Sequence, residues 1–255
     1  MPTALGVNDD VLHYEVSGAG PWLMLGYPFA GLGLEPVPDL PDAFLAQLTD
    51  HFRVIVVDYP RGVGRSAAPS PDVMTVDNVC TELLDVATAA GADRFAYWGY
   101  SWGAVAGLQL ASRTSRLTAL VVGGWPPLGG PYDDMRAMTA QAAADRSLPG
   151  QVLGMVQGWD VFYRSMKGWD ETALQAITCP RMCYVGADDV VVQHGVTVGV
   201  TELIAARAAE LQLQEWAIEV LPGLDHGGAM TNADAVVPSV RAFLQNALGN
   251  EPTTS

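Results

Sequence analysis

Hydrophobic and polar positions along the chain follow two periods, and the period changes repeatedly from one segment to the next. Short apolar or alternating runs bounded by glycine and polar residues predict strands, and they cover residues 11–16, 21–25, 53–57, 95–98, 117–122, 182–185 and 217–221. Apolar residues spaced three and four positions apart predict helices, and they cover residues 76–90, 102–111, 203–211 and 233–248. Strands and helices therefore alternate along most of the chain.

This alternation is typical of an α/β fold. It predicts a mostly parallel central sheet with helices on both faces. Hydrophobic residues make up 49% of the chain and charged residues 16%, which is typical of a compact globular protein. Since single α/β domains routinely reach 255 residues, we expect one domain over residues 1–255.

The segment between the strands at 117–122 and 182–185 is too long for one strand–helix repeat. It opens with the turn-rich residues 123–131, and helical patterns follow over residues 133–145 and 151–166. We interpret residues 125–178 as a small helical lid inserted into the domain. Residues 249–255 are polar and show no apolar periodicity, which predicts a flexible tail.

The formal net charge is −15, and no run of basic residues interrupts the acidic balance. Nucleic acids and anionic membranes are therefore poor partners. The N-terminal residues contain no basic segment followed by a long apolar stretch, so we expect no signal peptide.

The three cysteines are odd in number, which argues against a disulfide framework. Cys179 and Cys183 lie close together in the sequence, but no nearby Cys or His pair completes a four-ligand metal set. We interpret them as packed thiols, and we expect no metal, no cofactor and a cytoplasmic location.

Residues 99–103, Gly-Tyr-Ser-Trp-Gly, match the pattern G-x-S-x-G between a predicted strand and a predicted helix. In this context the serine lies on a strained turn, and the flanking glycines relieve backbone crowding. The serine hydroxyl is thereby exposed at the end of the sheet. Ser101 is the candidate nucleophile.

A serine hydroxyl is a weak nucleophile until a base takes its proton. His226 lies just past the last predicted strand, at the carboxyl edge of the sheet where sites form in α/β folds. The other histidines lie in the first hairpin, ahead of a strand and in a later loop; they are His13, His51 and His194. His226 is therefore the candidate general base.

The third partner of such a site is an acid that fixes the histidine tautomer and stabilises the imidazolium. Asp188 and Asp189 both follow the strand at 182–185, and Asp225 directly precedes His226. Neighbouring residues of an extended loop point in opposite directions, so only one of the first two faces the histidine. A bond from Asp225 to the ring of its own neighbour is geometrically awkward.

With these motifs the chain resembles the α/β-hydrolase superfamily, in its esterase and enol-lactonase-like branch. The order Ser101, Asp189, His226 is the order of that family, and its pattern of glycine, two variable residues and acid leads from Gly186 to Asp189. Residues 58–66 are similar to the family's D-x-R-G-x-G-x-S turn, although they are one residue longer.

Residues 25–28, Leu-Gly-Tyr-Pro, are similar to the family's His-Gly loop, with leucine where histidine is usual. The resemblance implies that the backbone N–H groups of Tyr27 and Trp102 form an oxyanion hole, which stabilises the charge that develops on a carbonyl oxygen.

Aromatic and methionine residues are frequent in the predicted lid. Such side chains can line an adaptable apolar pocket, although they can also form the core of the lid itself. We expect four of them to contact the substrate: Trp125, Trp159, Phe162 and Tyr163.

The predicted function is hydrolysis of a carboxylic ester or lactone of a small hydrophobic molecule through an acyl-enzyme on Ser101. Fold alone does not settle the chemistry. The same fold also serves cofactor-free haloperoxidases, carbon–carbon hydrolases and hydroxynitrile lyases, and it serves non-catalytic binding proteins, so these alternatives stay open.

Overall fold

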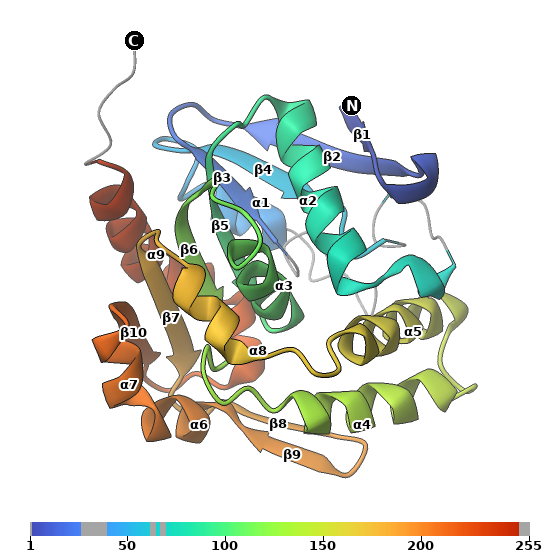
Figure 1. The fold of residues 1–255 in the computed structure, drawn as a ribbon. Helices are drawn as coiled ribbons and strands as arrows, with labels where there is room; N and C mark the ends of the chain where they lie inside the picture. The colour runs from blue at the N-terminus through green and yellow to red at the C-terminus, as the bar shows by residue number, and fades with distance from the viewer. Residues whose placement is uncertain (1, 27–39, 62–64, 67–69, 250–255) are drawn as a thin grey trace.

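The computed structural model describes residues 2–26, 40–61, 65–66 and 70–249. Eight strands build the main sheet, in the order β1-β2-β4-β3-β5-β6-β7-β10 (Figure 1). Their bounds are β1 (Thr3–Leu5), β2 (Val11–Ser17), β3 (Trp22–Leu25), β4 (Arg53–Val57), β5 (Phe95–Tyr100), β6 (Leu117–Gly123), β7 (Arg181–Gly186) and β10 (Trp216–Leu221). A separate hairpin consists of β8 (Val190–Gln193) and β9 (Val196–Gly199).

The strands from β4 to β10 in this order are parallel, and only β1 and β2 are antiparallel to their neighbours. The predicted mostly parallel sheet is confirmed. The chain passes from β3 to β4 on one side and then to β5 on the other side of β3. Ligands bind in α/β sheets at the carboxyl ends of strands beside such a reversal.

Helices cover both faces of the sheet, as the sequence predicted (Figure 1). The helices are α1 (Leu40–Leu45), α2 (Val76–Ala90), α3 (Trp102–Ala111), α4 (Tyr132–Ala144), α5 (Gly150–Ser165), α6 (Val200–Ala206), α7 (Ala208–Leu213), α8 (His226–Thr231) and α9 (Ala233–Leu248). Short 3-10 turns cover Val7–Asp9, Pro71–Val73 and Glu171–Ala176. No helix in the described ranges combines the length and the apolar character needed to cross a bilayer.

The central strand β5 shows why both faces need a cover. All six of its residues are buried. Because successive side chains of a strand point to opposite faces, Phe95 and Tyr97 pack on the side of α2 and α3, whereas Trp98 and Tyr100 pack on the side of α1 and α9. The fully apolar run at 95–98 is therefore typical of a strand covered on both sides.

The turn that follows β4 is held by buried charges. Glu82 on α2 accepts hydrogen bonds from Arg61 Nε at 2.9 Å, Tyr59 Oη at 2.9 Å and the Val7 backbone N–H at 3.1 Å. Arg61 also pairs with Asp10 and donates to the Val7 carbonyl. These contacts hold Tyr59 and Arg61 at the start of the segment over residues 58–66, of which residues 62–64 lie outside the described residues.

The inserted segment between β6 and β7 contains the two expected helices, α4 and α5, each beginning one residue earlier than predicted. The two helices pack against each other at one end of the sheet, and β9 of the hairpin contacts α4 (Figure 1). The tail predicted over residues 249–255 lies, beyond residue 249, outside the described residues.

Two local predictions are corrected. The single helix expected over residues 203–211 is two helices that meet at Arg207, whose φ of −114° is not helical. The break has a packing reason, since α6 contacts β7 and β8 whereas α7 contacts β10.

The second correction is the hairpin β8–β9, in a region expected to be a loop. Its turn residues His194 and Gly195 both have positive φ, 47° and 75°, as tight two-residue hairpins require. The signal lay in two valine-rich runs that are separated by a histidine and a glycine.

Candidate functional site

Ser101 occupies the sharp turn between β5 and α3. Its φ of 53° and ψ of −119° lie in a region that residues with a side chain rarely adopt. The turn is held because the Ser101 N–H donates to the Gly123 carbonyl at 2.8 Å. A Cβ on Gly99 would lie 2.3 Å from the Gly103 carbonyl oxygen, so this close approach requires glycine.

His226 begins α8, shortly after β10. Its Nε2 lies 3.1 Å from Ser101 Oγ, and its Nδ1 lies 2.8 Å from Asp189 Oδ1. With an ionised carboxylate accepting the proton of Nδ1, the lone pair of Nε2 faces the serine hydroxyl. The structure therefore brings together the three residues that the sequence singled out.

The three candidate aspartates have different surroundings. Asp189 is fully buried, whereas Asp188 and Asp225 are exposed. The Asp225 carboxylate accepts from the Gly228 N–H at 2.7 Å and caps α8. Only Asp189 contacts the ring of His226 among the three.

Tyr100 is a further neighbour of this cluster, beyond the residues predicted from the sequence. Its hydroxyl lies 3.2 Å from Asp189 Oδ2 and 2.9 Å from the backbone oxygen of His226. Burial, followed by the nearby Asp189 charge, raises the pKa of Tyr100 well above its usual range. The available signal in the sequence was its position: Tyr100 ends the buried strand β5 and directly precedes Ser101.

The two positions expected to form the oxyanion hole differ in what the structure describes. Trp102 is the first residue of α3, and the N–H groups of a first helical turn point toward the helix N-terminus, where negative charge is favoured. Tyr27 lies outside the described residues. The chain is described up to Gly26, whose N–H donates to the Trp98 carbonyl at 2.8 Å.

A cavity of about 250 Å³ opens beside Ser101 and His226. Its walls come from the inserted helices, from the hairpin β8–β9 and from the start of α3. None of the described residues that line it is an Asp, Glu, Lys or Arg, and His226 is the one histidine among them. The inserted helices and the hairpin contribute mainly Met135, Met138, Trp159, Tyr163, Val191 and Val198.

Three of the four residues expected at the substrate line this cavity, namely Trp125, Trp159 and Tyr163. Phe162 is a correction, because it is fully buried with its ring 5.0 Å from the ring of Trp102 and 5.5 Å from that of Tyr163. Phe162 and Tyr163 are successive helical residues and project about 100° apart. Phe162 therefore packs in the core while Tyr163 reaches the cavity.

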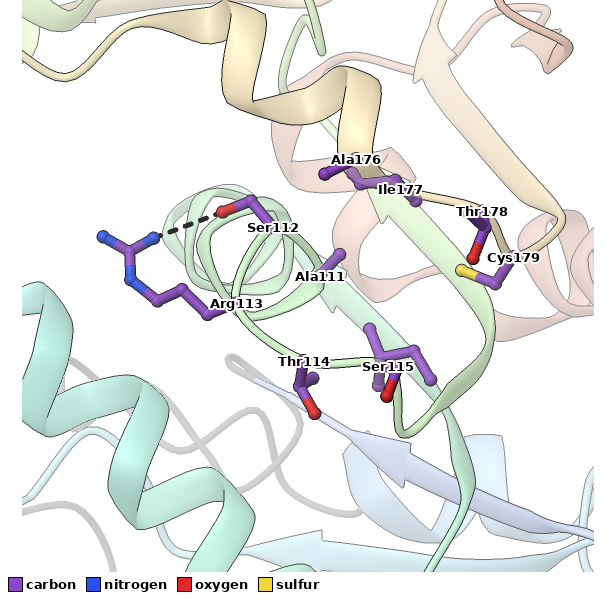
Figure 2. A pocket seen from close by; sticks show the side chains of 10 residues that line it. Ala111, Ser112, Arg113, Thr114, Ser115, Ala176, Ile177, Thr178 and Cys179 are labelled. Atoms are coloured by element: carbon purple, nitrogen blue, oxygen red, sulfur yellow. Dashed lines mark hydrogen bonds between the residues drawn. The ribbon is translucent and has the colours of Figure 1, made fainter.

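A second hollow lies at the other end of the strands, where β6 and β7 begin, and Figure 2 shows the side chains that line it. Its cation, Arg113, already bonds to Gln109, Ser112 and Asp77. Burial raises the pKa of the Cys179 thiol. Across the described part of the chain, no three His, Cys, Asp or Glu side chains are grouped as metal ligands. The cavity beside Ser101 is therefore the candidate site.

Comparison with known proteins gives a family match and several partial relatives. Residues 31–142 match the family model described as the alpha/beta hydrolase fold. RutD of Agrobacterium fabrum, which is named for carbamate hydrolysis, is 30% identical over 110 residues, which is 42% of this chain and 40% of that protein. RutD of Klebsiella pneumoniae is 39% identical over 82 residues, 31% of this chain and 30% of that protein. The matches thus span less than half the length of these curated relatives.

Solved structures match over nearly the whole chain. An enol-lactonase from Burkholderia xenovorans has a TM-score of 0.71 and 21% identity, with 96% of this chain and 100% of that chain covered. A thermophilic esterase from Thermogutta terrifontis has a TM-score of 0.69 and 20% identity, with 97% and 98% covered. At these identities the likeness shows the fold. The protein therefore has the fold of the α/β-hydrolase superfamily, which the resemblance in its sequence predicted.

Proposed function

We propose that the protein is a serine hydrolase that cleaves a carboxylic ester or lactone of a small, apolar molecule. The observation that carries this proposal is the series of hydrogen bonds from Asp189 through His226 to Ser101, which ends beside an apolar cavity. A buried acid, a histidine and a serine in this order supply a nucleophile, its base and the group that orients the base.

The proposed reaction begins when Ser101 Oγ attacks the carbonyl carbon of the substrate while His226 Nε2 takes the hydroxyl proton. Asp189 holds the ring and stabilises the imidazolium that forms. The backbone N–H of Trp102, together with that of Tyr27, stabilises the oxyanion. The tetrahedral intermediate then expels the alcohol, which takes the proton from His226.

The second half of the reaction regenerates the enzyme. His226 removes a proton from water, and the resulting hydroxide attacks the acyl group on Ser101. Collapse of this second intermediate releases the carboxylic acid, and the proton on His226 returns to Ser101 Oγ. For a lactone, the alcohol and the acid are released as one hydroxy acid.

The cavity favours an uncharged and compact substrate. Its volume of about 250 Å³ lies just below the range of about 300 to 1,000 Å³ that is typical of ligand pockets. A substrate charge would lose its hydration against methionine, tryptophan and valine side chains without gaining a partner of opposite charge there, which is unfavourable.

We infer that residues 125–178 serve as a lid within a single domain over residues 1–255. The support is that α4 and α5 supply Met135, Met138, Trp159 and Tyr163 to the cavity wall. We also infer a cytoplasmic location, for which the three free cysteines are the support.

A carbamate is a second candidate substrate. The observation that favours it is the partial sequence match with RutD proteins, which are named for carbamate hydrolysis. A carbamate carries the same electrophilic carbonyl carbon, so Ser101 and His226 would perform the same acyl transfer with a carbamoyl group on the serine.

The test is a substrate panel measured with the wild-type protein and with Ser101→Ala. The panel holds p-nitrophenyl esters of increasing chain length, small lactones, a p-nitrophenyl carbamate, a vinylogous diketone, and hydrogen peroxide with a halide acceptor. We expect turnover of short esters or lactones that depends on Ser101, and labelling of Ser101 by a fluorophosphonate. Turnover of the diketone alone, or a folded protein that no fluorophosphonate labels, contradicts the proposal.

A further inference from the structure

We propose that Tyr100, the residue before the candidate nucleophile, is a positioning residue that holds Asp189 and His226 in the geometry of the proton relay. This inference rests on the proposed function of the Ser101 site. It adds a fourth side chain to the hydrogen-bonded series, one that touches neither the substrate nor Ser101 Oγ.

The first observation concerns the second oxygen of the buried acid. Asp189 is fully buried, and its Oδ1 is bonded to His226 Nδ1 at 2.8 Å. The Tyr100 hydroxyl lies 3.2 Å from Oδ2. A carboxylate oxygen buried away from water needs a donor, because an unpaired buried charge is strongly unfavourable. Tyr100 supplies that donor and so keeps the carboxylate turned with Oδ1 toward the histidine.

The second observation concerns the main chain of the base. The Tyr100 hydroxyl also lies 2.9 Å from the His226 backbone oxygen, so its single proton is shared between this oxygen and Asp189 Oδ2. His226 is thus held at its ring by Asp189 and at its backbone by Tyr100. Because Tyr100 and Ser101 are adjacent in the chain, the phenol links the start of α8 to the serine turn. This link supports the distance of 3.1 Å between His226 Nε2 and Ser101 Oγ.

The third observation is that the ring of Tyr100 has no room to swing. A Cβ on Gly124 would lie 2.4 Å from Tyr100 Cζ, and one on Gly123 would lie 2.5 Å from its Cδ2. The ring of Tyr184 lies 5.7 Å away on another side. The backbone therefore packs directly on the phenol, and the position of its oxygen is fixed by the fold.

The hydroxyl must also remain protonated to act as a donor. The imidazole of His226 faces the phenol, with the two ring centroids 5.1 Å apart. The other titratable groups that face Tyr100 are Asp189, Asp225 and Tyr184, none of which is a cation. Burial and these neighbours raise the pKa of Tyr100 well above its usual range. The phenol is therefore a neutral donor throughout the pH range in which a histidine base works.

The experiment compares Tyr100→Phe with a matched control, Tyr184→Phe. Tyr184 is a buried tyrosine of β7 in the same core cluster as Tyr100, and its hydroxyl accepts from Trp98 Nε1 at 3.2 Å. Both variants lose one buried phenolic oxygen, but only Tyr100→Phe loses a bond to Asp189 and His226. Circular dichroism and thermal melting establish that both variants fold.

We expect Tyr100→Phe to lower kcat for a p-nitrophenyl ester by about tenfold, the order of one hydrogen bond to a charged group, with KM changed by less than about twofold. The acidic limb of kcat/KM should also move to higher pH. The reason is that the Asp189 carboxylate, once it has lost the Tyr100 hydrogen bond, stabilises the imidazolium form of His226 more strongly. Tyr184→Phe should leave kcat and the limb unchanged.

A second readout needs no turnover. The NMR resonance of the proton on His226 Nδ1 should move downfield in Tyr100→Phe, upfield when 3-fluorotyrosine replaces Tyr100, and not at all in Tyr184→Phe. Identical resonances and pH profiles for the two phenylalanine variants would overturn the inference. If the wild-type protein turns over no ester, lactone or carbamate, the proposed function fails, and the resonance still decides the role of Tyr100.

Discussion

Among the residues that the structure describes, two carboxylates are almost completely buried, one on α2 and one after β7, and their partners differ in kind. Glu82 on α2 is bonded to Arg61, to Tyr59 and to a backbone N–H. Arg61 is itself saturated by Asp10 and by a backbone carbonyl. A guanidinium stays charged at every physiological pH, so this cluster is closed and cannot exchange a proton.

Asp189 after β7 is bonded instead to His226 and Tyr100, and the series continues to Ser101 at the edge of a cavity. A histidine changes charge near neutral pH. The comparison teaches that burial of a carboxylate does not by itself mark a catalytic site. What distinguishes the second cluster is a histidine partner, which changes charge near neutral pH, and an end that reaches a cavity.

The largest expected effect comes from removing the Ser101 hydroxyl, where the hydrogen-bonded series from Asp189 reaches the cavity. Ser101→Ala should lower kcat for the preferred ester by at least about 10⁴-fold, because only the oxyanion hole and binding remain to accelerate the reaction. The measurement is steady-state hydrolysis by a folded variant, checked by circular dichroism. Activity within about tenfold of the wild type would show that another group is the nucleophile.

The next effect tests the acid. Asp189→Asn should lower kcat by about 10⁴-fold, because an amide can favour the wrong histidine tautomer. Asp188→Asn and Asp225→Asn are the matched controls, since both side chains are exposed, and each should change kcat by less than about tenfold. A larger loss at either control than at Asp189 would move the acid to that residue.

The closed cluster should respond in stability rather than in activity. Glu82→Gln leaves the Arg61 charge buried without its main partner and should destabilise the fold by about 3 to 5 kcal/mol, which lowers Tm by about 10 °C. The control is Glu210→Gln, which breaks an exposed ion pair with Arg207 and should change stability by less than about 1 kcal/mol.

Activity of the folded fraction of Glu82→Gln should stay within about twofold of the wild type well below its Tm. A drop of several hundredfold in kcat at full folding would erase the distinction between the two clusters.

The smallest effect is the change in kcat/KM when the pH is varied across the range in which a histidine loses its proton. We expect kcat/KM of the wild type to rise with pH across the range in which a histidine loses its proton and then to level off, since the base must be neutral to accept the serine proton. The measurement is a profile between about pH 5 and 8 with a neutral ester. A flat profile would remove the feature that sets the second cluster apart from the first.

Much of the fold and site followed from the sequence because the signals are local. The strand at 95–98, the motif at 99–103 and the helix that follows are adjacent in the chain, so a short window holds the whole serine turn. The same applies to the stop of α2 at Gly91, which has a φ of 80°. His226 could be placed because it comes shortly after an apolar strand.

Tertiary structure decided what depends on residues far apart in the chain. His226 lies 37 positions from Asp189 and 125 positions from Ser101, and only the order of strands in the sheet brings them within hydrogen-bond distance. The contact of Tyr100 with both partners arises in the same way, as does the position of Phe162 beneath Trp102.

Periodicity predicts which face of an element is buried, because that depends on neighbours three, four or two positions away. It does not say what the buried face contacts. Glu82 on α2 and the break at Arg207 show this limit. Glu82 is explained by a guanidinium on another loop, and the break by the different strands that α6 and α7 contact. Such contacts are set by packing across the whole domain, which a local pattern does not contain.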